Sequence, residues 1–128
     1  MIRVLATSAV LACGAAETAR ANAWSLVPSG TSFERVDDKA TFVQIVADRA
    51  LKRFGIQLEV NPDGTIAGKA FGRDVAGAWQ WQDGFFCREL FWGNWEVGAN
   101  CQAVEVSGDM MRFTSDRGRG DFADLRLR

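Results

Sequence analysis

The chain has 128 residues, which is the size of a single domain. Charged residues make up 24% of it and hydrophobic residues 48%, a balance typical of folded globular proteins and not of disordered ones. With 15 basic and 16 acidic residues the formal net charge is −1, so no basic surface for nucleic acid is expected. Histidine is absent, which excludes Ser–His and Cys–His nucleophilic pairs and removes the commonest metal ligand.

Residues 1–23 have the pattern of a secretory signal peptide. Arg3 precedes an apolar run, residues 4–16, that is too short to cross a bilayer. Two small-x-small sites follow this run and allow cleavage after Ala21 or Ala23. The pattern therefore predicts that the chain is exported to the periplasm or secreted.

A lipoprotein is the alternative interpretation of the same segment. Residues 10–13 resemble a lipobox in which Cys13 would carry the lipid. The segment before Cys13 would be unusually short, so lipid anchoring ranks second. In either case residues 24–128 are expected to form one domain that does not span the membrane.

Two cysteines, Cys87 and Cys101, follow the signal peptide. An even number of cysteines in an exported protein predicts a disulfide, which would close a loop of about 15 residues and stabilise the fold by roughly 3 kcal/mol. A metal site needs more ligands than these two thiols, and a reactive pair usually has C-x-x-C spacing. We therefore predict a structural disulfide and no metal or other cofactor.

One helix is expected, over residues 38–47, after an irregular lead at residues 24–32. Asp37 or Asp38 can cap its first turn. Its apolar face, at helical spacing, comprises Phe42, Ile45 and Val46.

From residue 49 onward, Gly and Asp punctuate the chain about every 8–12 residues, the spacing of an all-β sandwich or barrel. Three turns fix a register: Asn61-Pro62-Asp63-Gly64, Asp83-Gly84 and Gly108-Asp109. The resulting pairs are Val60–Ile66, Leu58–Gly68, Gln57–Lys69, Gln82–Phe85, Trp81–Phe86, Trp79–Arg88, Val106–Met111, Val104–Phe113 and Glu105–Arg112. Residues 116–121 are expected to be a hairpin tip before a last strand that turns Ala123, Leu125 and Leu127 inward.

The predicted fold class is therefore mainly β. We expect a small antiparallel β-barrel or sandwich of about seven strands, with one N-terminal helix and one disulfide.

Two segments could carry binding. Trp79 and Trp81 share one face of a strand with Arg88 opposite Trp79, so they could form a mouth in which Arg88 fixes the polar end of a ligand. The alternative is that both indoles fill the core, because a small β domain without Tyr must use Trp and Phe there.

The second segment, residues 91–100, is expected to be a loop inside the disulfide and carries Trp92 and Trp95. Loops on a rigid scaffold often hold recognition residues, and Trp is enriched at interfaces. The alternative is that one of the two indoles folds back as a lid over the barrel.

Parts of the sequence resemble a group of short exported proteins of alphaproteobacteria that often carry the label dihydrodipicolinate reductase. The resemblance covers about residues 42–128. Its strings are Gly77-x-Trp79-x-Trp81-x-Asp83-Gly84-x-Phe86-Cys87-Arg88, Trp92-Gly93, Asn100-Cys101-Gln102 and Arg112-Phe113-Thr114-Ser115-Asp116-Arg117-Gly118. The sequence lacks the Gly-rich nucleotide turn and paired histidines of a true reductase. A fainter resemblance is to small periplasmic barrel inhibitors of proteases, which also combine Gly-x-Trp with one disulfide.

The first hypothesis is an exported, non-enzymatic binding module that recognises a small ligand or a periplasmic protein. The second is an inhibitor of a periplasmic hydrolase, either a protease or a lysozyme. The third is an enzyme, either the reductase of the label or one that works with carboxylates alone. The sequence leaves the ligand and the oligomeric state open. The candidate carboxylates are Asp74, Asp83, Glu89 and Glu96.

Overall fold

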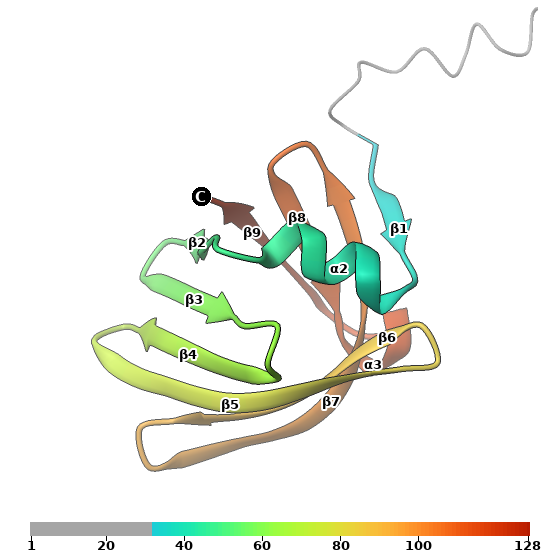
Figure 1. Cartoon of the computed structure of the whole chain (residues 1–128). Coiled ribbons are helices and arrows are strands. Elements are labelled where there is room, and N and C mark those ends of the chain that lie inside the picture. The colour runs from blue at the N-terminus through green and yellow to red at the C-terminus, as the bar shows by residue number, and fades with distance from the viewer. Residues whose placement is uncertain (1–31) are drawn as a thin grey trace, which may run out of the picture.

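The computed structural model describes residues 32–128 (Figure 1). The predicted signal peptide and the candidate lipid site at Cys13 lie outside the described residues. The elements in chain order are β1 (Glu34–Val36), α2 (Lys39–Val46), β2 (Leu51–Arg53), β3 (Ile56–Val60), β4 (Thr65–Ala70), β5 (Arg73–Gln82), β6 (Phe85–Trp92), β7 (Trp95–Ser107), β8 (Met110–Thr114), α3 (Ser115–Gly118) and β9 (Phe122–Leu127).

Strands β2 to β9 form a closed antiparallel barrel in which each strand pairs with the next one along the chain. The ring closes where β2 pairs with β9, with Leu51 opposite Leu127. β1 is an extra strand, which pairs with the last part of β7. The structure thus confirms a mainly β fold of the barrel type. The expected count of about seven strands is too low, because β1 and β2 have three residues each and are too short to show alternation.

The register predicted from the turns is confirmed at all three hairpins. Trp81 pairs with Phe86, Val60 with Ile66, and Val104 with Phe113. Asp83 and Gly84 both have positive φ, as the two-residue turn requires. Turn chemistry and alternation act over a few residues, so the sequence already contains the information that sets these pairings.

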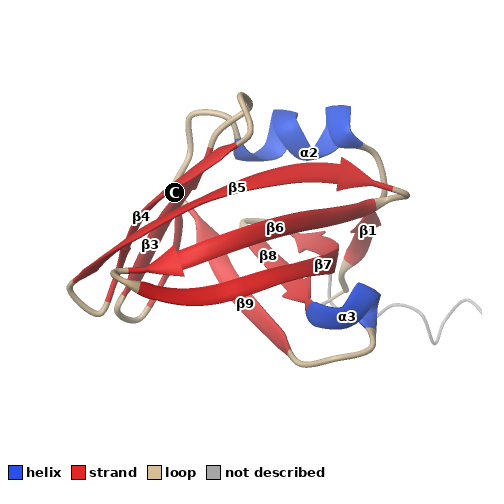
Figure 2. Cartoon of the chain, turned by 90° about the horizontal axis from the view of Figure 1, so that it is seen from below, coloured by secondary structure: helices blue, strands red, loops and turns tan. Residues whose placement is uncertain are grey.

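Helix α2 packs against the inner face of the barrel near one of its ends (Figure 2). Asp38 is the N-cap, and its carboxylate accepts a hydrogen bond from the Thr41 amide at 3.1 Å. Phe42 is 0% exposed. Its ring lies 5.0 to 5.3 Å from those of Trp79, Trp81 and Phe86. The predicted helix is therefore present, and it joins the core through Phe42 and Val46.

Residues 91–100 are not a loop. They belong to β6 and β7, which meet in a tight turn at Gly93-Asn94, with Trp92 paired to Trp95. Gly93 has φ of 58°, so the chain can reverse without leaving the ladder. The disulfide therefore joins two strands of one hairpin and does not tie the ends of an irregular segment.

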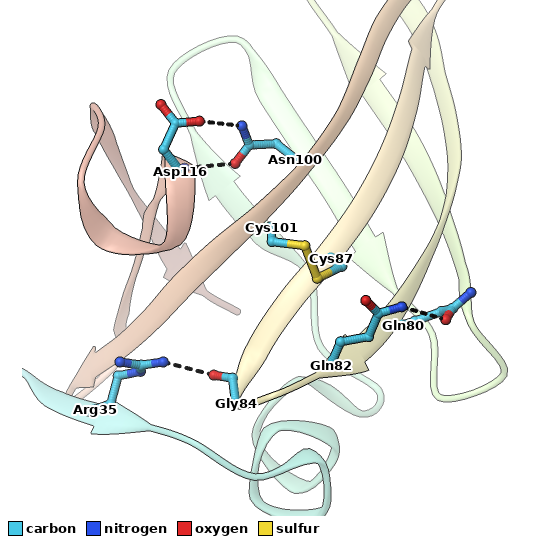
Figure 3. The surroundings of a disulfide bond; sticks show 8 residues. All are labelled: Arg35, Gln80, Gln82, Gly84, Cys87, Asn100, Cys101 and Asp116. Atoms are coloured by element: carbon cyan, nitrogen blue, oxygen red, sulfur yellow. Dashed lines mark hydrogen bonds between the residues drawn. A yellow bond between two sulfur atoms is a disulfide. The ribbon is translucent and has the colours of Figure 1, made fainter.

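Residues 116–121 are also different from the expected hairpin tip. The connection begins with the short helical turn α3, in which Asp116 and Arg117 have positive φ. Asn100 of β7 holds this turn: its amide donates to the Asp116 carboxylate, and its carbonyl accepts from the Asp116 amide, both at 2.9 Å (Figure 3). A side chain from a distant strand, which local patterns do not reveal, thus stabilises the turn.

Candidate functional site

The turns that join β2 to β3, β4 to β5 and β6 to β7 lie together at one end of the barrel, away from α2 (left in Figure 1). We call this the open end, because the barrel interior is hollow behind it. A cavity of about 200 Å³ lies there between the strands. Its walls are apolar apart from Arg53, Arg88 and Gln102.

An apolar groove of about 360 Å³ lies beside this cavity. The cavity and the groove share three wall residues, Ile56, Leu58 and Leu90. The residues that line only the groove are Ala70, Phe71, Val75, Phe91, Trp92, Trp95 and Val97. The cavity and the groove therefore adjoin along these three apolar side chains.

Trp92 and Trp95, which the sequence predicted for a loop, both line the groove, but one is held in place and the other is exposed. The Trp92 indole donates a hydrogen bond to the Ala70 carbonyl at 2.7 Å, and the Arg73 guanidinium lies 4.9 Å from its ring centroid. Trp92 is thus a fixed wall. Trp95 is 66% exposed and makes part of the rim.

Exposed phenylalanines extend this aromatic rim. Phe54, in the turn after β2, is 92% exposed, and Phe71, in the turn after β4, is 63% exposed. Both precede a glycine, and the Phe71 ring covers Gly55. Sequence reasoning missed both residues. The signal that could have found them is a large apolar side chain at a turn position, where polar residues are usual.

Arg88 enters the cavity from β6, between the inward-facing Phe86 and Leu90. Its Nη1 donates to the Gly98 carbonyl at 2.9 Å. Partial burial lowers the pKa of the guanidinium below its ordinary value, although an arginine still keeps its proton in proteins. The side chain therefore supplies a half-buried positive charge within an apolar wall.

Trp79 and Trp81 belong to the core. Trp79 is 5% exposed, and its indole donates to the Asn61 carbonyl at 2.8 Å. The Trp81 indole donates to the Asp37 carbonyl at 3.3 Å. Neither residue lines the interior cavity or the groove. The cation over the Trp79 ring is Lys39, at 5.6 Å, and not Arg88, which reaches toward Gly98 instead.

The predicted disulfide is confirmed and lies on a different face of the sheet from the cavity. Cys87 and Cys101 are directly paired on β6 and β7 (Figure 3). They border a polar surface depression of about 540 Å³, together with Gln80, Gln82 and Arg117. The bond braces the hairpin that carries Trp92 and Trp95, and thereby stiffens one side of the open end.

The candidate carboxylates do not reach the cavity. No carboxylate lines the interior cavity or the groove, and Asp74 faces Lys69 on the surface at 3.6 Å. Within residues 32–128, no three His, Cys, Asp or Glu side chains lie close enough together to hold a metal ion. No helix of this part of the chain is long and apolar enough to cross a membrane.

Comparison with known proteins does not assign the chain to a family. No protein-family model, curated protein or solved structure matches the chain. The resemblance to exported proteins that carry the reductase label therefore stays a prediction. What is shown is a small antiparallel β-barrel with an apolar cavity and, beside it, an apolar groove lined in part by aromatic residues.

Proposed function

We propose that the protein is an exported, non-enzymatic binding module that takes the apolar part of a small ligand into the open end of its barrel. The observation that supports this most directly is the apolar cavity in the barrel, which adjoins an apolar groove along Ile56, Leu58 and Leu90. Eight-stranded barrels have interiors just wide enough to be filled by side chains or to hold one small ligand. Here, side chains fill the interior beside α2 and leave it hollow at the other end.

The walls of this site are ordered before any ligand arrives. The indole hydrogen bond of Trp92, the cation over its ring and the nearby disulfide all hold the β6–β7 hairpin in place. Binding to a preformed site avoids the entropy cost of ordering its side chains. A concave apolar site with few polar groups is the usual form of a small-molecule site.

Titration with the neutral apolar dye N-phenyl-1-naphthylamine tests the proposal. We expect saturable dye fluorescence that decan-1-ol displaces. Leu58→Trp fills the shared wall and should weaken dye binding at least tenfold. The matched control is Glu59→Trp, on the exposed face of the same strand, which should bind as the wild type does. Absence of wild-type binding, or full binding by Leu58→Trp, would contradict the proposal.

The proposed location is the periplasm or the exterior. The signal-peptide pattern of residues 1–23 and the Cys87–Cys101 disulfide support it, since such bonds persist in oxidising compartments. Fractionation of producing cells, with thiol labelling of the recovered chain, tests this point. Recovery of a reduced chain in the cytosol would contradict it.

Inhibition of a periplasmic hydrolase is the second candidate. It is favoured by the exposed pair Trp95 and Val97, which the braced hairpin presents beside the rim. An exposed indole on a rigid hairpin is the kind of residue that dominates protein interfaces. If this candidate is correct, the protein should lower the activity of a periplasmic protease or lysozyme, and Trp95→Ala should abolish the effect. No inhibition by the wild type would discard it.

A further inference from the structure

The charges around the cavity are of one sign. Arg53 and Arg88 are the only charged residues among those that line it. Neither forms an ion pair with any residue between 32 and 128, where the ion pairs belong to other cations. Arg53 is exposed and lies near enough to Asp124 to lower the pKa of that carboxyl, so its charge is partly offset. Arg88 is therefore the half-buried positive charge of the apolar interior, and no carboxylate lines the cavity beside it.

Arg88 has hydrogen-bonding capacity to spare. Only its Nη1 has a protein partner within the described chain, the Gly98 carbonyl, which leaves Nε and Nη2 without one. No side-chain nitrogen of this part of the chain is both fully buried and unsatisfied, so the two open donors remain accessible. A guanidinium presents its donors as a planar fork that matches a carboxylate or a phosphate in two-point contact.

The position of Arg88 relative to the groove favours one orientation of a bound ligand. Arg88 lies inside, one inward position before Leu90, whereas the groove that leads outward has no charged lining residue. A ligand with an anionic group at one end would place that group at Arg88. Its apolar chain would then run past Leu58 and Leu90 toward Trp92 and Trp95.

From this polarity we infer that the ligand is a single-headed anionic amphiphile, such as a medium-chain fatty carboxylate or an alkyl phosphate, with Arg88 as the counter-ion of its head group. The inference rests on the proposed function. A neutral alcohol would leave the half-buried guanidinium unpaired, and a cationic amphiphile would be repelled by Arg88. A charge-assisted pair is worth about 1.5–3 kcal/mol, which corresponds to at least about tenfold in affinity.

Binding of four ligands of equal chain length to the wild type tests the inference: decanoate, decyl phosphate, decan-1-ol and decyltrimethylammonium. We expect at least one of the two anions to bind about tenfold or more tightly than the alcohol, and the cation to bind most weakly. Whichever anion binds more tightly distinguishes a carboxylate from a phosphate head group. Equal affinity for the anions and the alcohol would overturn the inference but leave the proposed function intact, whereas no binding of any ligand or dye would remove both.

Variants then locate the counter-ion. Arg88→Met keeps an apolar stem without the charge, so it should lose the preference for the anions while still binding N-phenyl-1-naphthylamine. Arg88→Lys should restore part of the preference. The matched control is Lys52→Met on the exposed face of β2, which removes the same charge and should keep the full preference. If Lys52→Met loses the preference as fully as Arg88→Met, general electrostatics and not a site explains the selectivity. Should Arg88→Met fail to fold, the four wild-type affinities still decide.

Discussion

Arg112 shows how strongly single side chains are held on the outside of this barrel. Its guanidinium lies 4.1 Å from the ring centroids of both Phe33 and Phe122. It also donates to the Asp124 carboxylate through Nε at 2.7 Å and Nη2 at 3.0 Å. The hydrogen bond from Arg112 is the main reason why the pKa of Asp124 lies below its ordinary value.

A lowered pKa in the folded state means that the Asp124 carboxylate stabilises the fold at neutral pH. This contribution is lost as the pH falls through the acid range, because protonation then favours the unfolded chain. We expect Asp124→Asn to melt at a lower temperature than the wild type at pH 7, and the difference to shrink toward about pH 2. Thermal melts across this range measure it. Asp121→Asn, at an exposed residue just before β9, is the control and should melt close to the wild type at pH 7. A pH-independent difference for Asp124→Asn would contradict the assignment.

At the scale of elements, α2 joins the core through Phe42 and Val46, of which Phe42 is the larger side chain. Phe42 is fully buried against three aromatic rings, so Phe42→Ala would leave a cavity and cost about 3–5 kcal/mol. Phe42→Leu should cost less. Phe54→Ala removes an equally large side chain that is 92% exposed and should change stability by less than about 0.5 kcal/mol. Urea unfolding of the three variants measures these differences, and equal losses at the two positions would show that α2 does not seal the core.

The β6–β7 hairpin is the second element whose contribution can be measured. Cys87→Ala/Cys101→Ala removes a bond that closes a loop with a sequence separation of 14. In the chain-entropy model this costs about 3 kcal/mol, although strand pairing should keep the hairpin itself in place. Unfolding free energies of the variant and of the reduced wild type should agree with each other. If both match the oxidised wild type, the disulfide does not contribute to stability.

Elements could be predicted from the sequence where the causes are local. Asp83-Gly84 fixed the pairing of Trp81 with Phe86, and the spacing of Phe42 and Val46 indicated the helix. The length of β7 could not be foreseen, because Gly93-Asn94 and Gly98 look like loop residues until the neighbouring strands pair with them. Of the candidate binding residues, Arg88 lines the cavity and Trp92 and Trp95 line the groove, whereas Trp79 and Trp81 pack around Phe42. An indole is apolar whether it lies in a core or in a binding site. Trp79 and Trp81 belong to the core because Phe42 of α2 packs against them, and the sequence does not reveal where α2 packs.

At the scale of the whole molecule, ligand binding and folding are linked. A ligand that binds only the folded barrel at about 100 times its Kd should stabilise it by about 2.7 kcal/mol. For a domain of this size the melting temperature should rise by on the order of 10 °C. Differential scanning fluorimetry with the tightest of the ten-carbon ligands measures the shift. Glu59→Trp should keep the shift and Leu58→Trp should lose it, and an equal shift in both would point to binding elsewhere on the surface.

The barrel closes where β2, its first strand, pairs with β9, its last strand, with Leu51 opposite Leu127. Every other neighbour pair of the barrel is contiguous in the chain and can form by local zippering, but this one must bring together distant segments. During folding, β2 therefore keeps an unpaired edge until β9 reaches it. Refolding should likewise show early hairpins and a late, slower docking of the first strand of the ring against the last.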